Sequence, residues 1–174
     1  MFSSLKKCMQ IEEPKGVRER ALKTFSRIEG LDDVKEMLLR ALESPLLIGP
    51  PACAKSLFML EIEKYMSSKR VYFAEGASTT KAGLQKFIGE NQHKEIIIID
   101  EIDKMPMKDQ EGLLTMMERG EFTNTKVRNT KIVKANAVMF ATSNSTERLS
   151  KPLLSRFTVF EIPQYTYRVR GNIC

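Results

Sequence analysis

Two short stretches of the chain carry the residue types that phosphate and metal chemistry requires. The first follows the apolar run 46–48 and consists of Gly49, Pro50, Pro51, Ala52, Cys53, Ala54, Lys55 and Ser56. A helical pattern comes next. In a strand–loop–helix unit of this kind, backbone N–H groups and the positive end of the helix dipole converge on an anion. We expect Lys55 to contact terminal phosphates as a point charge and the Ser56 hydroxyl to ligate Mg²⁺.

The second stretch is a run of four isoleucines, residues 96–99, followed by Asp100 and Glu101. An uninterrupted apolar run predicts a strand that is buried on both faces, as in a parallel sheet. Such a strand delivers both carboxylates at its carboxyl end, where ligands bind in open α/β sheets. We expect Asp100 to hold the magnesium shell and Glu101 to orient or deprotonate an attacking water. Together the two stretches predict a site for ATP and Mg²⁺.

In this order the two stretches resemble the Walker A and Walker B elements of the AAA+ ATPases. The resemblance covers residues 26–163. It implies an α/β fold, a three-layer α/β/α P-loop NTPase core whose five-stranded parallel sheet has the strand order 5-1-4-3-2. The chain departs from the family at Ala52 and Ala54, where the usual loop carries glycine. If both alanines had to be left-handed, at about 1 kcal/mol each, roughly 2 kcal/mol of strain would weaken nucleotide binding about thirtyfold.

Length and composition set the broad class of protein. A chain of 174 residues, 42% hydrophobic and 29% charged, is typical of one globular domain. Its net charge of +6 is compatible with an acidic partner such as nucleic acid. The three widely spaced cysteines predict neither a disulfide framework nor a zinc site, which favours a reducing, cytoplasmic setting. No apolar run approaches membrane-spanning length and the first residues lack a signal-peptide core, so we expect no membrane partner.

The chain divides into three parts in this interpretation. Residues 1–25 form a partly helical N-terminal extension, residues 26–163 the AAA+ nucleotide-binding domain, and residues 164–174 a tail where a lid would begin. Members of the family normally continue into a small helical lid with a second sensor arginine, and the tail is too short to hold one. The resemblance also places Ile28 near the adenine, whereas packing of Ile28 in the core is an equal alternative.

A basic hairpin is expected between the helix near 108–119 and the next buried strand. Residues 122–127 and 130–133 are rich in β-formers and predict its two arms. It resembles the pre-sensor-1 hairpin of minichromosome-maintenance helicases, magnesium chelatases and the RuvB-like branch-migration motor, which projects toward the ring channel or a partner protein. Its basic residues are candidates for salt-dependent contacts with DNA phosphates, and the alternative is a merely solvated face; they are Lys126, Arg128, Lys131 and Lys134.

Two further positions match motifs of the family. The strand 138–142 ends at Ser143-Asn144, the sensor-1 position, where the Asn144 amide would hydrogen-bond the γ-phosphate and the attacking water. The alternative is an ordinary turn. Arg156, in the segment 152–157, resembles an arginine finger that acts on ATP held by the neighbouring subunit. That role would require at least a dimer, and we expect a ring; the alternative is a surface salt bridge.

These motifs predict an oligomeric AAA+ ATPase that binds ATP and hydrolyses it with Mg²⁺. ATP hydrolysis would drive DNA remodelling or translocation of the helicase type, or remodelling of a protein complex. One alternative is a hydrolysis-poor nucleotide-binding switch or assembly subunit that acts on a protein partner, suggested by Ala52, Ala54 and the missing lid. The presence of Glu101 argues against it, because such a subunit has no use for a water-activating carboxylate. Another alternative is a nucleic-acid-binding module in which ATP only sets the oligomeric state.

Overall fold

The computed structural model describes residues 16–40, 44–67, 70–91, 95–126, 129–134 and 137–164. Arg128, the N-terminal extension before residue 16 and the tail after residue 164 lie outside the described residues. The predictions that concern these segments therefore stay predictions.

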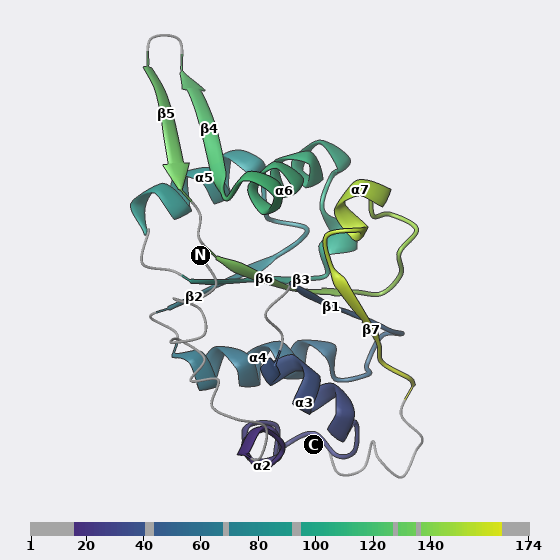
Figure 1. Ribbon diagram of the computed structural model, residues 1–174. Helices are drawn as coiled ribbons and strands as arrows, with labels where there is room; N and C mark the ends of the chain where they lie inside the picture. Colours follow the sequence, from purple (N-terminus) through teal and green to yellow (C-terminus); the bar gives the residue numbers. More distant parts are fainter. Residues whose placement is uncertain are drawn as a thin grey trace.

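A five-stranded sheet forms the middle of the molecule (Figure 1). Its strands are β1 (Pro45–Ile48), β2 (Val71–Glu75), β3 (Ile96–Asp100), β6 (Val138–Ser143) and β7 (Thr158–Glu161). Every pair is parallel, and the order across the sheet is β2-β3-β6-β1-β7. When these five strands are numbered along the chain, this is the predicted order 5-1-4-3-2, which is confirmed.

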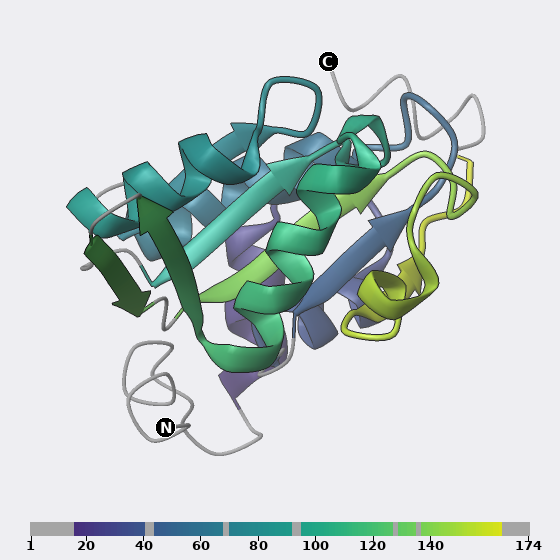
Figure 2. The same ribbon diagram turned by 90° about the horizontal axis from the view of Figure 1, so that it is seen from above.

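Helices cover both faces of the sheet (Figures 1 and 2). One layer holds α2 (Val17–Thr24), α3 (Asp32–Arg40) and α4 (Lys55–Met66). The opposite layer holds α5 (Lys81–Glu90), α6 (Met107–Arg119) and the short α7 (Lys151–Leu154), with the 3₁₀ turn η2 (Ile102–Lys104) leading into α6. The chain therefore has the predicted three-layer α/β/α architecture.

The isoleucine run explains why β3 lies inside the sheet. Ile96 and Ile98 pack into the core on the α2–α4 side, whereas Ile97 and Ile99 pack into the core on the α5–α7 side. None of the four is more than 2% exposed. A strand with apolar side chains on both faces is stable only where both faces are covered, as in this layered arrangement.

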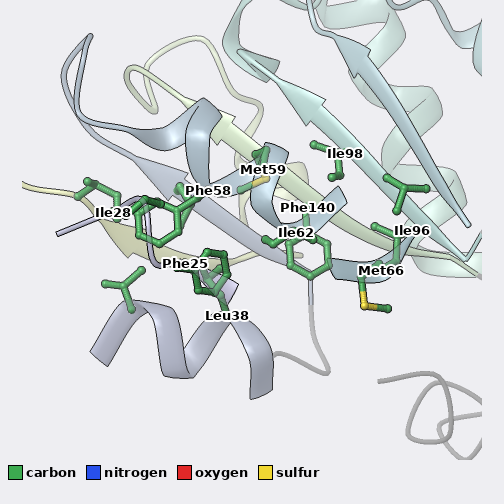
Figure 3. Close-up of a cluster of buried hydrophobic side chains, with 14 of the residues drawn as sticks. Phe25, Ile28, Leu38, Phe58, Met59, Ile62, Met66, Ile96, Ile98 and Phe140 are labelled. Atoms are coloured by element: carbon green, nitrogen blue, oxygen red, sulfur yellow. The ribbon is translucent and has the colours of Figure 1, made fainter. Parts of the chain in front are cut away.

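Ile28 belongs to the core on the α2–α4 side. Its side chain is 1% exposed and lies in one cluster with Phe25, Leu38 and Phe58 (Figure 3). The structure thus shows the core-packing alternative, and contact between Ile28 and adenine stays a prediction. Among the described residues no helix is long and apolar enough to cross a membrane.

The predicted hairpin is present. β4 (Glu121–Lys126) and β5 (Asn129–Lys134) pair antiparallel in a two-stranded sheet of their own. They follow α6 and project away from the layer of α5 and α6 (Figure 1). The hairpin is therefore separate from the parallel sheet.

Candidate nucleotide and metal site

The loop between β1 and α4 makes a tight turn with left-handed residues. Ala52 and Ala54 have φ angles of 60° and 64°, so both alanines are left-handed. Gly49 allows a close approach, because a Cβ there would lie 2.3 Å from the Ile162 carbonyl oxygen and 2.9 Å from Cys53 Sγ. The sequence left open whether both alanine positions need a left-handed backbone, and the structure shows that they do.

Lys55 begins α4, and its ammonium group lies within the loop. The side chain is 6% exposed, and Nζ donates to the carbonyl oxygens of Gly49 at 2.7 Å and Pro50 at 2.8 Å. Nζ also donates to Asn144 Oδ1 at 3.0 Å. The buried positive charge is therefore held by oxygen atoms of the loop and of the segment that follows β6.

Asp100 and Glu101 lie at the carboxyl end of β3, next to the end of β6. The Thr142 hydroxyl donates to Asp100 Oδ1, and its oxygen accepts the N–H of Glu101 at 2.9 Å. Glu101 has a φ angle of 54°, another left-handed residue. Its carboxylate lies between two donors, Lys104 Nζ at 2.6 Å from Oε2 and Asn144 Nδ2 at 3.5 Å from Oε1.

The charges around Glu101 favour its ionised form. The hydrogen bond from Lys104 holds the pKa of the Glu101 carboxyl below its usual value, although partial burial opposes this effect. The charge of Lys104, the Asn144 amide and the Lys55 ammonium lower the pKa further. Reciprocally, Glu101 raises the pKa of Lys104. The carboxylate is therefore charged at neutral pH, as a group that accepts a proton or orients a water must be.

A cavity of ≈ 280 Å³ joins the phosphate loop to the carboxyl ends of the strands. Its lining combines loop residues, the two carboxylates and the amide after β6: Pro51, Ala52, Cys53, Ala54, Lys55, Ser56, Leu57, Asp100, Glu101 and Asn144. A second cavity of ≈ 270 Å³ lies beside Tyr72 and Phe87 and shares no residue with this set. The first cavity is the candidate site because charged and polar groups converge in it.

The donor set of this cavity suits Mg²⁺. Asp100 supplies a carboxylate and the exposed Ser56 a hydroxyl, whereas the described residues contain no cluster of three or more His, Cys, Asp or Glu side chains. Mg²⁺ is usually held by one or two carboxylates together with waters and substrate phosphates. A softer metal such as zinc would need a fuller set of protein ligands.

Arg156 and the basic hairpin, which were also predicted to be functional, lie outside this cavity. Arg156 is exposed and its Nη2 donates to Glu118 Oε1 on α6 at 2.6 Å, so the structure shows the surface ion pair that was the alternative to a finger. Arg156 does not line the cavity of its own chain. The role of Arg156 as an arginine finger on the ATP of a neighbouring subunit stays a prediction. The basic hairpin also contributes no residue to this lining.

Three residues around Glu101 were not predicted to act at the site: Gly76, Lys104 and Thr142. A Cβ on Gly76 would lie 2.2 Å from the Glu101 carbonyl oxygen, and the Gly76 N–H donates to the Asp100 carbonyl oxygen at 2.7 Å. Lys104 forms its ion pair with Glu101, while Asp103 Oδ1 accepts the N–H of Asn144 at 3.4 Å. The one sequence signal that could have indicated a role for Thr142 is its position two residues before Asn144.

Comparison with known proteins identifies the family. Residues 45–164 match the model of the "ATPase family associated with various cellular activities (AAA)", a span that runs from β1 past β7 and covers more than half of the chain. The chain belongs to the AAA family of ATPases. The AAA domain thus contains the phosphate loop, both carboxylates, Asn144 and Arg156.

Similar proteins include AAA+ members with different names. The maternal DNA replication licensing factor mcm6 of Xenopus tropicalis is 28% identical over 144 residues, which are 67% of this chain and 17% of that protein. The Lon protease of Clostridium acetobutylicum is 24% identical over 83% of this chain and 23% of its own length. The Lon protease of Lachnoclostridium phytofermentans is 29% identical over 83% of this chain and 22% of its own length. The chain therefore spans between 17% and 23% of the length of these curated relatives.

Proposed function

We propose that this AAA domain binds ATP in the cavity at the phosphate loop and hydrolyses it to ADP and phosphate with Mg²⁺. The observation that carries the proposal is the meeting of four side chains from three distant parts of the chain in one cavity: Lys55, Asp100, Glu101 and Asn144. Such a combination of cation, carboxylates and amide suits phosphoryl transfer to water.

The loop and the first turn of α4 bind the phosphates of ATP in this proposal. Backbone N–H groups of residues 52–54 and the start of α4 supply positive dipoles, because Pro50 and Pro51 have no N–H, and Lys55 adds a full charge. Ser56 and Asp100 would hold Mg²⁺, which would supply positive charge against the phosphate oxygens. Lys55 already lies within hydrogen-bond distance of Asn144, so the loop and the sensor position act on the same phosphate.

Glu101 acts on the attacking water, and Asn144 supports it. The hydrogen bond from Lys104 is the main cause that lowers the pKa of the Glu101 carboxyl, and Glu101 Oε1 lies 3.5 Å from the Asn144 amide nitrogen. An ionised carboxylate at this place orients the water and accepts its proton. In this proposal the Asn144 amide contacts that carboxylate and binds the γ-phosphate.

The first experiment compares the wild type with Glu101→Gln, measuring both Mg²⁺-dependent ATP turnover and nucleotide binding. We expect turnover to fall at least about a hundredfold, because general-base catalysis contributes 10² to 10⁴-fold, while binding stays within about threefold, because Glu101 contributes little to affinity. Glu111→Gln, on the exposed surface of α6, is the matched control and should leave both unchanged. Absence of nucleotide binding in the wild type would overturn the proposal.

A second candidate is the hydrolysis-poor switch or assembly subunit. Ala52 and Ala54 favour it, because they stand at left-handed positions where the loop of the AAA+ ATPases usually carries glycine. Nucleotide binding without turnover in the wild type and in Glu101→Gln alike would support this candidate. Turnover that disappears in Glu101→Gln would support the ATPase.

The proposal also covers the oligomeric assembly and the process that ATP hydrolysis drives. We place the chain in a cytoplasmic ring in which Arg156 acts on the ATP of the neighbouring subunit and the hairpin contacts DNA. The basic hairpin and the name of the licensing-factor relatives support DNA remodelling or translocation. The name of the Lon relatives supports a protein partner instead. The nucleic-acid-binding module differs from both because its DNA affinity would not depend on ATP turnover.

A further inference from the structure

We propose that Thr142 is a positioning residue of the hydrolytic site, which fixes Asp100 and Glu101 through one buried hydroxyl group. The inference rests on the proposed function for its catalytic consequence, and on the geometry of the end of β3 for its physical basis.

The Thr142 hydroxyl joins the two acidic residues directly. It donates its hydrogen to Asp100 Oδ1 and accepts the backbone N–H of Glu101 at 2.9 Å. A hydroxyl has one hydrogen to donate and can accept as well, so both bonds form at the same time. Thr142 is fully buried at 0% exposure, and water cannot replace either bond.

The sheet itself does not supply these bonds. On the β6 side of β3 the last paired residues are Ile99 and Ala141, so the pairing with β6 ends just before the acidic residues, whereas on the β2 side it continues to Asp100 and Glu75. Glu101 then turns into the left-handed region, with a φ angle of 54°, and its N–H donates to the Thr142 side chain. A left-handed residue that is not glycine is retained only where its surroundings hold it. The Thr142 hydroxyl provides one such restraint.

The close packing of Gly76 restrains the same turn from the neighbouring strand β2. A Cβ at residue 76 would meet the Glu101 carbonyl oxygen at 2.2 Å and Ile102 Cα at 3.0 Å. The Glu101 backbone therefore lies between Gly76 on one side and Thr142 on the other. Gly76 sets the position of the carbonyl, and Thr142 sets the direction of the N–H and of the Asp100 carboxylate.

A matched pair of variants separates the hydroxyl from the packing of the side chain. Thr142→Val keeps the shape of threonine and removes the hydroxyl, whereas Thr142→Ser keeps the hydroxyl and removes a methyl group. We expect Thr142→Val to lower kcat about tenfold or more, in line with the loss of a hydrogen bond to a charged group. The Mg²⁺ concentration for half-maximal turnover should rise with it, because Asp100 loses its orienting partner. Thr142→Ser should retain most of the wild-type kcat.

Binding without metal distinguishes positioning from a general defect. Thr142 contacts neither Lys55 nor the phosphate loop through any hydrogen bond described for these residues. Nucleotide binding in EDTA should therefore be the same in wild type, Thr142→Val and Thr142→Ser. Equal kcat and equal Mg²⁺ dependence in wild type and Thr142→Val would overturn the inference, and so would an equal loss in both variants.

Amide hydrogen exchange at Glu101 tests the inference apart from turnover. We expect this amide, followed by NMR in the protein without nucleotide, to exchange about tenfold faster in Thr142→Val than in Thr142→Ser, because its acceptor is lost. Unchanged exchange would overturn the inference even if the wild type is an active ATPase. If the wild type binds nucleotide but does not hydrolyse it, hydrolysis is overturned as the function. The rate of amide exchange at Glu101 would still decide whether Thr142 is a positioning residue.

Discussion

At the scale of single residues, Ala52 and Ala54 distinguish this phosphate loop from one that carries glycine at the same positions. Both have a left-handed backbone, at φ angles of 60° and 64°, where glycine costs least. The conformation belongs to the fold of the loop, between a Gly49 that is packed against the Ile162 carbonyl and the start of α4. The strain is therefore part of the free energy of folding, and the thirtyfold weakening of nucleotide binding considered from the sequence does not follow from it.

The double variant Ala52→Gly, Ala54→Gly tests this account. Relief of about 2 kcal/mol of strain is offset by the entropy of two glycines in the unfolded chain, at roughly 0.5–1 kcal/mol each. We expect the free energy of unfolding to rise by about 1 kcal/mol or less, measured by urea denaturation. The nucleotide dissociation constant, measured by calorimetry, should change less than about threefold, since the loop geometry is retained. A thirtyfold tightening would show that the alanines oppose binding itself.

At the scale of elements, the hairpin of β4 and β5 stands apart from the layered core. It pairs only with itself and projects beyond α5 and α6 (Figure 1). Residues 122–134 include four basic residues and no acidic one, and Glu121 at the start of β4 is paired with Lys134 in the register of the two strands. Contacts of such residues with DNA phosphates release counterions, so the affinity would depend on salt.

Alanine at the four basic positions 126, 128, 131 and 134 should weaken DNA binding and reduce its salt dependence. If each residue contacts a phosphate, the slope of log affinity against log salt should become shallower by about 3.6, or 0.9 for each lost contact. The measurement is fluorescence anisotropy of a labelled duplex over a series of salt concentrations. The control removes the same charge from exposed positions elsewhere, Arg18, Lys23, Lys108 and Lys151, and should have a smaller effect on the slope. Equal DNA affinity in the hairpin variant and the wild type would exclude the hairpin as the DNA-binding element.

At the scale of the whole molecule, Arg156 raises the question of assembly. Within one chain it forms an exposed ion pair with Glu118, and such pairs contribute little to stability. An exposed arginine held by one carboxylate is also accessible to a neighbouring subunit. Members of the AAA family generally form oligomers, and in our proposal Arg156 then completes the site of the next subunit.

Mixing two inactive variants tests the action of Arg156 on a neighbouring subunit. Arg156→Ala keeps Glu101, and Glu101→Gln keeps Arg156, so an interface between the two variants can contain both functional residues. We expect each variant alone to be nearly inactive, and an equal mixture to recover up to about a quarter of wild-type turnover if subunits mix at random. Glu118→Gln removes the partner of Arg156 and should leave turnover largely intact. A mixture no more active than its components would contradict action between subunits.

Much of the fold follows from local patterns in the sequence. Ile96–Ile99 predict a buried parallel strand because only such a strand hides apolar side chains on both faces, and Asp32 and Asp33 suit the start of α3 because they complement its dipole. The strand order followed from the resemblance to the family. The meeting of the loop, the acidic pair and the segment after β6 follows from the rule that parallel strands end at one edge of the sheet.

The tertiary structure alone decided how the side chains at that edge contact one another. Thr142 bonds to Asp100 and Glu101, at sequence separations of 42 and 41, only because of the register of β3 and β6. Gly76 packs against Glu101 because the ends of β2 and β3 lie side by side. The sequence by itself determined which residues could do the chemistry and which end of the sheet carries them. Their mutual distances depended on packing between segments far apart in the chain, and no local pattern records that packing.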